Sequence, residues 1–167
     1  MAFEERFGRL LDEHGAALGR LVAAYESDRH EREDLLQDIL LAIWRALPSF
    51  RGESSERTFI YRVAHNRAIT HRHRRRSNVS SLHDVPEPPD PRDPPDLALA
   101  RAQQEERLFT AVRSLPAAYR QAVMLRLEGL SHREVAEVLG TSENNVAARL
   151  SRARKKLSAL LAEERLA

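Results

Sequence analysis

Apolar residues recur along the chain at steps of three and four residues, in several separate stretches. Such steps place side chains on one face of a helix. Leu, Ala, Arg and Glu dominate the composition, and they favour helix. The pattern therefore predicts an all-α fold with helices over residues 3–25, 31–47, 58–76, 97–115 and 116–129, followed by a helix pair over 130–156 whose second member continues through Leu161.

The helix pair has the pattern of a helix-turn-helix. Gly140 stands where the first helix must stop and the chain must turn. Thr141 or Ser142 can cap the second helix, and Val146 points back to the first. The outer face of the second helix holds polar and basic side chains: Ser142, Asn144, Asn145, Arg149, Arg152, Arg154, Lys155 and Lys156. Such groups reach base edges and phosphates in the DNA major groove. The alternative is a helical hairpin with a solvated charged face.

The segment over residues 49–76 combines a polar loop with a basic helix. Phe50 lies in the loop, while Tyr61, Arg62 and Asn66 fall on or near the outer side of the helix. Bases of single-stranded nucleic acid stack on aromatic rings while arginines hold the backbone. A core aromatic with a solvated basic end explains the same residues, and the pattern leaves both interpretations open. Histidines of this helix are two positions apart, which is no metal-ligand spacing, so no metal site is predicted.

The helix over residues 31–47 has a strong apolar stripe that we expect to be buried: Leu35, Leu36, Ile39, Leu40, Ile43, Trp44 and Leu47. The opposite face is polar except for one leucine, and it holds Asp34, Gln37, Asp38, Leu41 and Arg45. Such a face is either solvated or a docking surface, and composition alone does not choose between these two.

Six of the eight prolines lie in residues 77–96. Such a stretch cannot form a helix and has almost nothing to bury, so it predicts an extended, acidic, Pro-rich linker between two small helical domains, residues 1–76 and 97–167. Residues 51–76 carry eight basic and two acidic side chains, and residues 97–167 carry twelve and eight. Two basic segments separated by an acidic one indicate two contacts with a polyanion. The acidic linker is either solubilising or a mimic of a nucleic acid strand.

The composition also argues against several classes of function. The chain has no cysteine, which excludes disulfides and thiolate sites and fits a reducing cytoplasm. No apolar run approaches a membrane span, and residues 1–20 are too polar for a signal peptide. No paired-carboxylate, nucleophile or phosphate-loop pattern is present. We therefore expect a cytoplasmic protein without membrane insertion that is no enzyme and takes no cofactor, metal or small-molecule substrate.

Taken together, these segments resemble a bacterial sigma factor of the sigma-70 family, in the short two-domain form of the extracytoplasmic-function (ECF) group. DLLQDILLAIWRAL is similar to the polymerase-docking helix of the family. SFRGESSERTFIYRVAHNRAITHRHRRR is similar to its promoter-melting and −10 segment in the sigma2 domain. LPAAYRQAVMLRLEGLSHREVAEVLGTSENNVAARLSRARKKL is similar to its sigma4 domain, which binds the −35 element. The resemblance covers nearly the whole chain.

The resemblance implies a role for each set of residues. Those at the clamp helices of polymerase are Asp34, Gln37, Asp38, Leu41 and Arg45. Those that bind the −10 element, with Phe50 in the pocket for a flipped base, are Phe50, Arg51, Ser54, Ser55, Arg57, Tyr61, Arg62 and Asn66. Those that bind the −35 element are Ser142, Asn144, Asn145, Arg149, Ser151 and Arg152. The implied linker path runs through the active-site and RNA-exit channels of polymerase.

The implied function is transcription initiation by promoter recognition and melting. The implied partners are core RNA polymerase, through its beta and beta-prime subunits, promoter DNA and a cognate anti-sigma factor. Two alternatives are a stand-alone helix-turn-helix regulator and a sigma-like decoy that binds an anti-sigma factor. The sequence departs from the family pattern at four positions: Phe59 replaces a frequent tryptophan, Glu56 is acidic in a loop that faces DNA, and Ala147 and Ala148 replace polar or basic residues.

Overall fold

The computed structural model describes residues 3–78 and 95–166. In chain order the elements are α1 (Phe3–Ala23), α2 (Arg29–Ala46), the 3-10 turn η1 (Leu47–Ser49), α3 (Glu56–Asn78), α4 (Pro95–Ser114), α5 (Ala117–Leu127), α6 (His132–Leu139) and α7 (Glu143–Leu166). These two ranges contain no strand, so the predicted all-α fold is confirmed. Residues 79–94, which make up most of the predicted linker, lie outside the described residues.

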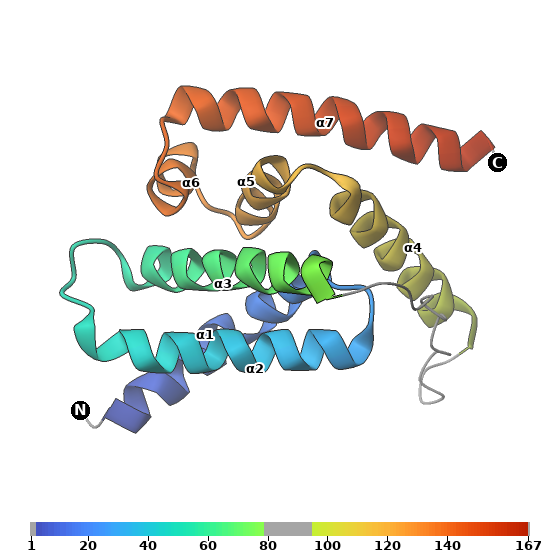
Figure 1. The fold of residues 1–167 in the computed structure, drawn as a ribbon. Helices are drawn as coiled ribbons and strands as arrows, with labels where there is room; N and C mark the ends of the chain where they lie inside the picture. The colour runs from blue at the N-terminus through green and yellow to red at the C-terminus, as the bar shows by residue number, and fades with distance from the viewer. Residues whose placement is uncertain (1–2, 79–94, 167) are drawn as a thin grey trace.

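Helices α1, α2 and α3 form the N-terminal half of the molecule. Helices α2 and α3 run antiparallel side by side, and α1 crosses behind them (Figure 1). Asp28 begins α2, because its carboxylate accepts a hydrogen bond from the backbone N–H of Glu31 at 3.0 Å. The apolar stripes predicted for these helices meet in a fully buried core that includes Leu18, Leu35, Ile39, Ile43, Ile60, Ala64 and Ala68. Burial of each large aliphatic side chain contributes roughly 1.5–3 kcal/mol.

Helices α4 to α7 form the C-terminal half. Helices α5 and α6 lie beneath the first part of α7, while α4 slopes away from them (Figure 1). The buried residues that join these helices include Ala122, Leu125, Val135, Val146 and Ala153. None of the described helices is both long enough and apolar enough to cross a membrane.

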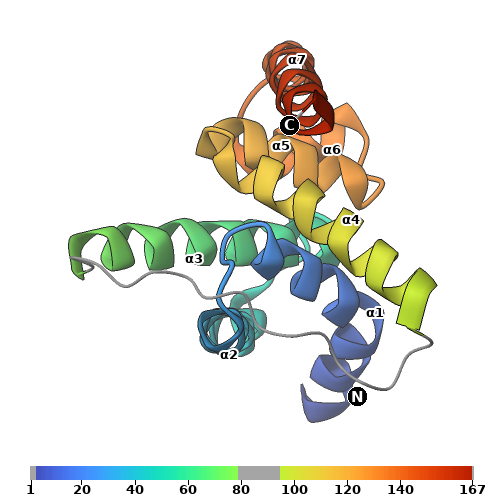
Figure 2. The ribbon, with the colours of Figure 1, turned by 90° about the vertical axis from the view of Figure 1, so that its right-hand side faces the viewer.

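The two halves pack against each other. Helices α5 and α6 lie directly on α3 (Figure 2), and the last turn of α4 reaches the end of α1, where Arg113 donates to the Ala23 carbonyl. One continuous apolar cluster includes Leu21 and Ala64 of the N-terminal half and Val112 and Leu125 of the C-terminal half. The two halves are therefore in contact, although the sequence predicts two domains joined by an extended proline-rich linker.

The structure corrects two placements that the periodicity predicts, those of Trp44 and Tyr61. Trp44 is 37% exposed rather than buried, because it lies near the end of α2. Its ring still packs edge-on against Phe3 and Phe7, with 4.4 and 4.9 Å between ring centroids. Leu108 is 39% exposed, because only the last turn of α4 reaches the core. Tyr61 is buried rather than outward-facing, because other parts of the chain cover α3 on more than one side, and His65 is buried for the same reason.

Candidate nucleic-acid interface

The helix-turn-helix is closed by local hydrogen bonds at both ends of α6. Ser131 and Glu134 form a capping box, in which the Glu134 N–H donates to Ser131 Oγ at 3.2 Å and the Ser131 N–H donates to Glu134 Oε2 at 2.7 Å. The latter bond lowers the pKa of the Glu134 carboxyl. Gly140 ends the helix with φ of 62°, a left-handed conformation that favours glycine. The turn predicted at Gly140 is therefore present.

Helix α7 begins with a cap that the sequence left open between Thr141 and Ser142. Ser142 Oγ accepts from the Asn145 N–H at 3.2 Å, so Ser142 is the capping residue. The Asn145 side chain donates to Thr141 Oγ1 at 2.9 Å and accepts from Arg149 Nε at 3.1 Å. These bonds orient Asn145 and Arg149 relative to each other on the outward side of the helix.

The residues predicted to bind the −35 element gather on the outward side of α7. Ser142, Asn144, Asn145, Ser151 and Arg152 are exposed, and Arg149 is half-buried. Val146 and Ala153, on the other side of the helix, are fully buried. Since the inward residues anchor the helix, its polar face is a rigid, solvent-facing surface of the size that a major groove accepts.

The residues predicted to dock on polymerase share one face of α2. Asp34, Gln37 and Arg45 are exposed, and Leu41 is 44% exposed. Asp38 is half-buried and forms an ion pair with Arg67 of α3 at 3.4 Å. An exposed leucine surrounded by charged and polar groups is a common arrangement at protein interfaces.

The loop between η1 and α3 presents Phe50 near the surface. The Phe50 ring lies 4.8 Å from the Phe59 ring, and the Arg6 guanidinium lies 5.5 Å from its centroid. Ser55 caps α3, because its hydroxyl accepts from the Thr58 N–H at 3.0 Å. This cap starts α3 at Glu56, two residues earlier than predicted. Arg51 and Ser55 are exposed, and Ser54 is half-buried.

The other predicted −10 residues lie along α3, where the C-terminal half covers several of them. Arg57 donates to the backbone carbonyl of Glu128, and Arg62 donates to that of Glu137 at 2.9 Å. Tyr61 is 3% exposed beneath the Arg57 guanidinium, and burial raises the pKa of its phenol. Asn66 remains exposed. Arg51, Arg62 and Asn66 are therefore exposed and Phe50 is half-buried, while Arg57 and Tyr61 lie where the C-terminal half packs on α3. Arg62 is exposed although it bonds to the C-terminal half.

Side-chain bonds reinforce this contact at Glu128. Both carboxylate oxygens of Glu128 accept from the Arg20 guanidinium at 2.7 Å, a bidentate pair that raises the pKa of Arg20. We name the contact of Arg20, Arg57 and Arg62 with Glu128 and Glu137 the interdomain contact.

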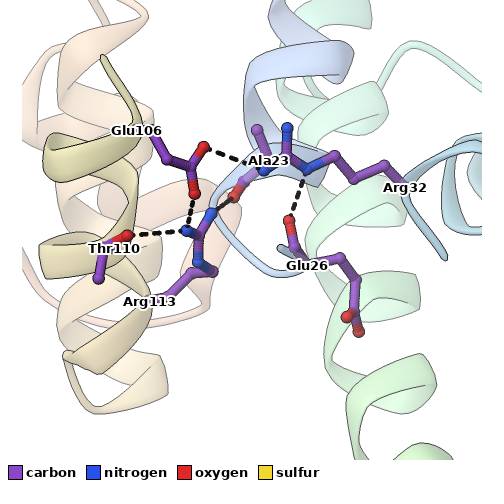
Figure 3. A network of polar contacts seen from close by, with 6 residues as sticks. All are labelled: Ala23, Glu26, Arg32, Glu106, Thr110 and Arg113. Atoms are coloured by element: carbon purple, nitrogen blue, oxygen red, sulfur yellow. Dashed lines mark hydrogen bonds and ion pairs between the residues drawn. The ribbon is translucent and has the colours of Figure 1, made fainter. Parts of the chain in front are cut away.

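A second network lies where α4 passes the N-terminal half (Figure 3). Arg113 donates to the Ala23 carbonyl at 2.8 Å and to Thr110 Oγ1 at 3.0 Å, and it pairs with Glu106. Glu106 also accepts from Arg32 at 3.4 Å. Arginines of both halves thus take part in the bonds that hold the halves together.

The histidines of α3 have structural surroundings. His65 Nδ1 lies 3.2 Å from Tyr25 Oη, and burial lowers the pKa of this imidazole to about 3. His71 Nε2 lies 3.7 Å from a Glu26 carboxylate oxygen and 3.6 Å from one of Glu31. Among the residues that the structure describes, no group of three or more acidic or histidine side chains could hold a metal ion.

Comparison with known proteins agrees with this geometry. Residues 10–78 match the family model of sigma-70 region 2, and residues 105–157 match that of sigma-70 region 4. The ECF RNA polymerase sigma-E factor of Haemophilus influenzae is 30% identical over 162 residues, which are 91% of this chain and 85% of that protein. The chain belongs to the sigma-70 family. It is an ECF sigma factor, which directs the initiation of transcription by RNA polymerase.

Further relatives have the same character. The RNA polymerase sigma factor NccH of Alcaligenes xylosoxydans xylosoxydans is 29% identical to this sigma factor over 93% of the chain and 86% of its own length. The solved structure of CnrH in complex with the cytosolic domain of CnrY is 28% identical, with a TM-score of 0.68 over 96% of this chain and 90% of that one. RpoE of Bartonella quintana, solved in complex with the anti-sigma factor NepR, shares the fold with a TM-score of 0.72 and 24% identity, over 94% of this chain and 97% of that one.

Sequence reasoning missed two residues that organise this surface. Glu128 joins Arg20 and lies beside Arg57, and Arg6 contacts the loop that carries Phe50. Periodicity assigns each of them to the polar side of its own helix. No local signal in the sequence indicates which distant helix such a side chain meets.

Proposed function

We propose that the two halves of this sigma factor divide promoter recognition between them. Residues 1–76 bind core polymerase and the −10 element, and residues 97–167 read the −35 element. The observation that carries the proposal is that the two predicted DNA-binding sets lie on separate surfaces. One set lies on the outward face of α7, and the other lies on the loop after η1 and on α3.

The −35 element is read in the major groove by the first turns of α7. Ser142, Asn144 and Asn145 are exposed at the N-terminal end of the helix, where short polar groups reach base edges. Arg149 and Arg152 follow one and two turns later and reach bases or phosphates. The bond from Arg149 to Asn145 supports this reading, because it orients both side chains before DNA arrives.

The −10 element is captured as unpaired bases by the loop around Phe50 and by Asn66. Extrusion of a base costs a few kcal/mol. Stacking on an aromatic ring returns about 1–3 kcal/mol per base. The half-buried Phe50 ring, supported by Phe59 and beside exposed Arg51, offers such a platform. Arg57, Tyr61 and Arg62 join this surface when the interdomain contact opens.

The beta and beta-prime subunits of polymerase dock on the exposed face of α2. The residues that they contact there are Asp34, Gln37, Asp38, Leu41 and Arg45. The sigma factor itself performs no catalysis, and it works in the cytoplasm, where polymerase and promoter DNA are found. A cognate anti-sigma factor holds it inactive. The related CnrH, which is solved with the cytosolic domain of another protein, supports such a partner.

Paired variants test the division of roles. Phe50→Ala with Asn66→Ala should slow promoter opening by about ten- to a hundredfold, the equivalent of one lost stacking interaction. It should leave duplex binding at the −35 element intact. Arg149→Ala with Arg152→Ala should instead weaken binding at the −35 element. Permanganate reactivity of the −10 bases and footprinting of the −35 element measure the two steps. Normal opening by the first double variant would refute the proposal.

A further inference from the structure

Arg6, near the start of α1, reaches the loop that carries Phe50. Its Nε and Nη2 atoms lie 2.8 and 2.7 Å from the same carboxylate oxygen of Glu56, the first residue of α3. Its guanidinium carbon lies 5.5 Å from the centroid of the Phe50 ring. One side chain from a distant helix thus contacts both the acidic residue and the aromatic residue of the proposed −10 surface.

The ion pair of Arg6 with Glu56 lowers the electrostatic repulsion between this surface and DNA. Glu56 places a negative charge next to a loop proposed to face DNA, where each phosphate is also negative. Like charges within about 8 Å of each other repel at physiological ionic strength. Because Arg6 neutralises Glu56, the charges that remain around the loop and the start of α3 are those of Arg51, Glu53 and Arg57, with a net charge of one positive.

The second contact restrains the aromatic platform. Residues 51–53 are exposed, and Gly52 has φ of 76°, so this loop has little burial to hold it. The Phe50 ring is held by Phe59 of α3 and by Arg6 of α1. A guanidinium over an aromatic ring contributes about 0.5–1 kcal/mol at an exposed site.

The start of α1 is itself anchored on the docking helix. Phe3 and Phe7, which flank Arg6, meet Trp44 of α2 edge-on at 4.4 and 4.9 Å. Trp44 lies next to Arg45, a residue of the proposed polymerase face. The first turns of α1 therefore connect the surface proposed for polymerase with the loop proposed for the −10 base.

We propose that Arg6 is a positioning residue for capture of the −10 base, which holds the Phe50 ring in place and neutralises Glu56 against the DNA backbone. This role rests on the proposed function of Phe50. Arg6 acts through Phe50 and Glu56 and needs no direct contact with a base.

The test uses holoenzyme assembled from core polymerase and each variant. A promoter fragment carries the fluorescent base 2-aminopurine in the −10 non-template strand, and its fluorescence rises when the base unstacks. Arg6→Ala should slow this rise about fivefold, from one lost cation–π contact and one lost ion pair. Arg6→Lys, which keeps the charge but not the planar group, should recover part of the rate. Arg6→Ala with Glu56→Gln should also recover part of it, because no unpaired charge remains.

Salt dependence separates this role from a merely structural one. The difference between Arg6→Ala and the unchanged protein should shrink as salt rises, because screening weakens the repulsion by Glu56. A general loss of stability would appear in thermal unfolding and would not follow salt in this way. Arg29→Ala is the matched control, since Arg29 pairs with Glu33 at the opposite end of α2, and it should open promoters at the normal rate.

The outcomes distinguish this inference from the proposed function. If Phe50→Ala opens promoters normally, the proposed function fails and the role of Arg6 fails with it. If Phe50→Ala is slow but Arg6→Ala is normal, only the role of Arg6 is wrong. If Arg6→Ala is slow but neither Glu56→Gln nor added salt restores opening, the neutralisation of Glu56 is refuted.

Discussion

His65 shows how strongly the packing of α3 changes the properties of a single residue. The side chain is fully enclosed next to Tyr25, and burial lowers its pKa to about 3. In the unfolded chain, a histidine takes up a proton near pH 6.5. Between these two values the unfolded state holds one more proton than the native state. The free energy of unfolding therefore falls as pH falls through this window.

We predict that replacement of His65 by Asn removes this part of the pH dependence. Between pH 7 and pH 5, His65 should account for about 2 kcal/mol of the lost free energy of unfolding. Urea denaturation at the two pH values measures the difference, and His30→Asn, at an exposed position, is the control. An equal pH dependence in the unchanged protein and the His65 variant would show that His65 is protonated in the native state.

The same residues show what the sequence could predict and what it could not. The inward positions Ile60, Ala64 and Ala68 follow from helical periodicity, because they form the main apolar stripe of α3. Tyr61 and His65 lie beside that stripe, and their burial depends on what covers the next face. That cover comes from other helices, and Glu128 is more than sixty residues away from Tyr61. The apolar pattern of one helix does not show which distant helix covers its other faces.

At the scale of elements, the caps and turns were the most predictable features. Gly140 ends α6 and Ser142 caps α7 through contacts with neighbouring backbone atoms only. Both therefore lie at the turn that the sequence predicts. The placement of α4 was less predictable. It has apolar positions at Leu99 and Leu108, yet both are exposed, because the helix extends beyond the core.

The corner between α4 and α5 depends on Arg120. This guanidinium is 1% exposed and donates to the carbonyls of Val112, Arg113 and Leu115 at 3.2, 2.5 and 2.8 Å. These carbonyls belong to the last turn of α4 and to the residue after it, where the helix leaves them without intrahelical partners. Arg120 also lies over the Tyr25 ring at 5.0 Å.

We predict that Arg120→Met lowers the free energy of unfolding by about 3 kcal/mol, because buried carbonyls lose charged donors that methionine cannot replace. Chemical denaturation followed by circular dichroism measures this loss. Arg107→Ala, at an exposed position of α4, should change it by less than about 0.5 kcal/mol. Equal stability of the two variants would show that Arg120 does not support the corner.

At the scale of the whole molecule, the interdomain contact covers part of the surface that the proposed function needs. Arg57 and Arg62 bond to carbonyls of the C-terminal half, and Tyr61 is buried beneath Arg57. Promoter binding through Arg57 and Tyr61 would require the two halves to separate, while Arg62 is exposed and would only have to release the Glu137 carbonyl. The resemblance of the segments predicted both DNA-binding surfaces but did not predict that one half would lie on the other.

We predict that Glu128→Lys favours separation of the halves, because it places a positive charge against Arg20 and beside Arg57. A loss of about 2 kcal/mol shifts the ratio of closed to open molecules by about thirtyfold. Small-angle scattering should show a larger radius of gyration, and holoenzyme should form open complexes faster. Glu105→Lys makes the same charge change on exposed α4 and should do neither. An unchanged radius in the Glu128 variant would show that the contact is held by other bonds.

We expect this chain to select promoters only as part of polymerase, through two elements at once. Run-off transcription on a library of random upstream sequences, with core polymerase in the presence and absence of the chain, tests it most directly. Paired −35 and −10 motifs should be enriched only when core polymerase and the chain are both present. The Phe50→Ala and Asn66→Ala double variant should enrich no −10 motif. Selection of a single duplex motif by the chain without polymerase would contradict this expectation and indicate a stand-alone helix-turn-helix regulator.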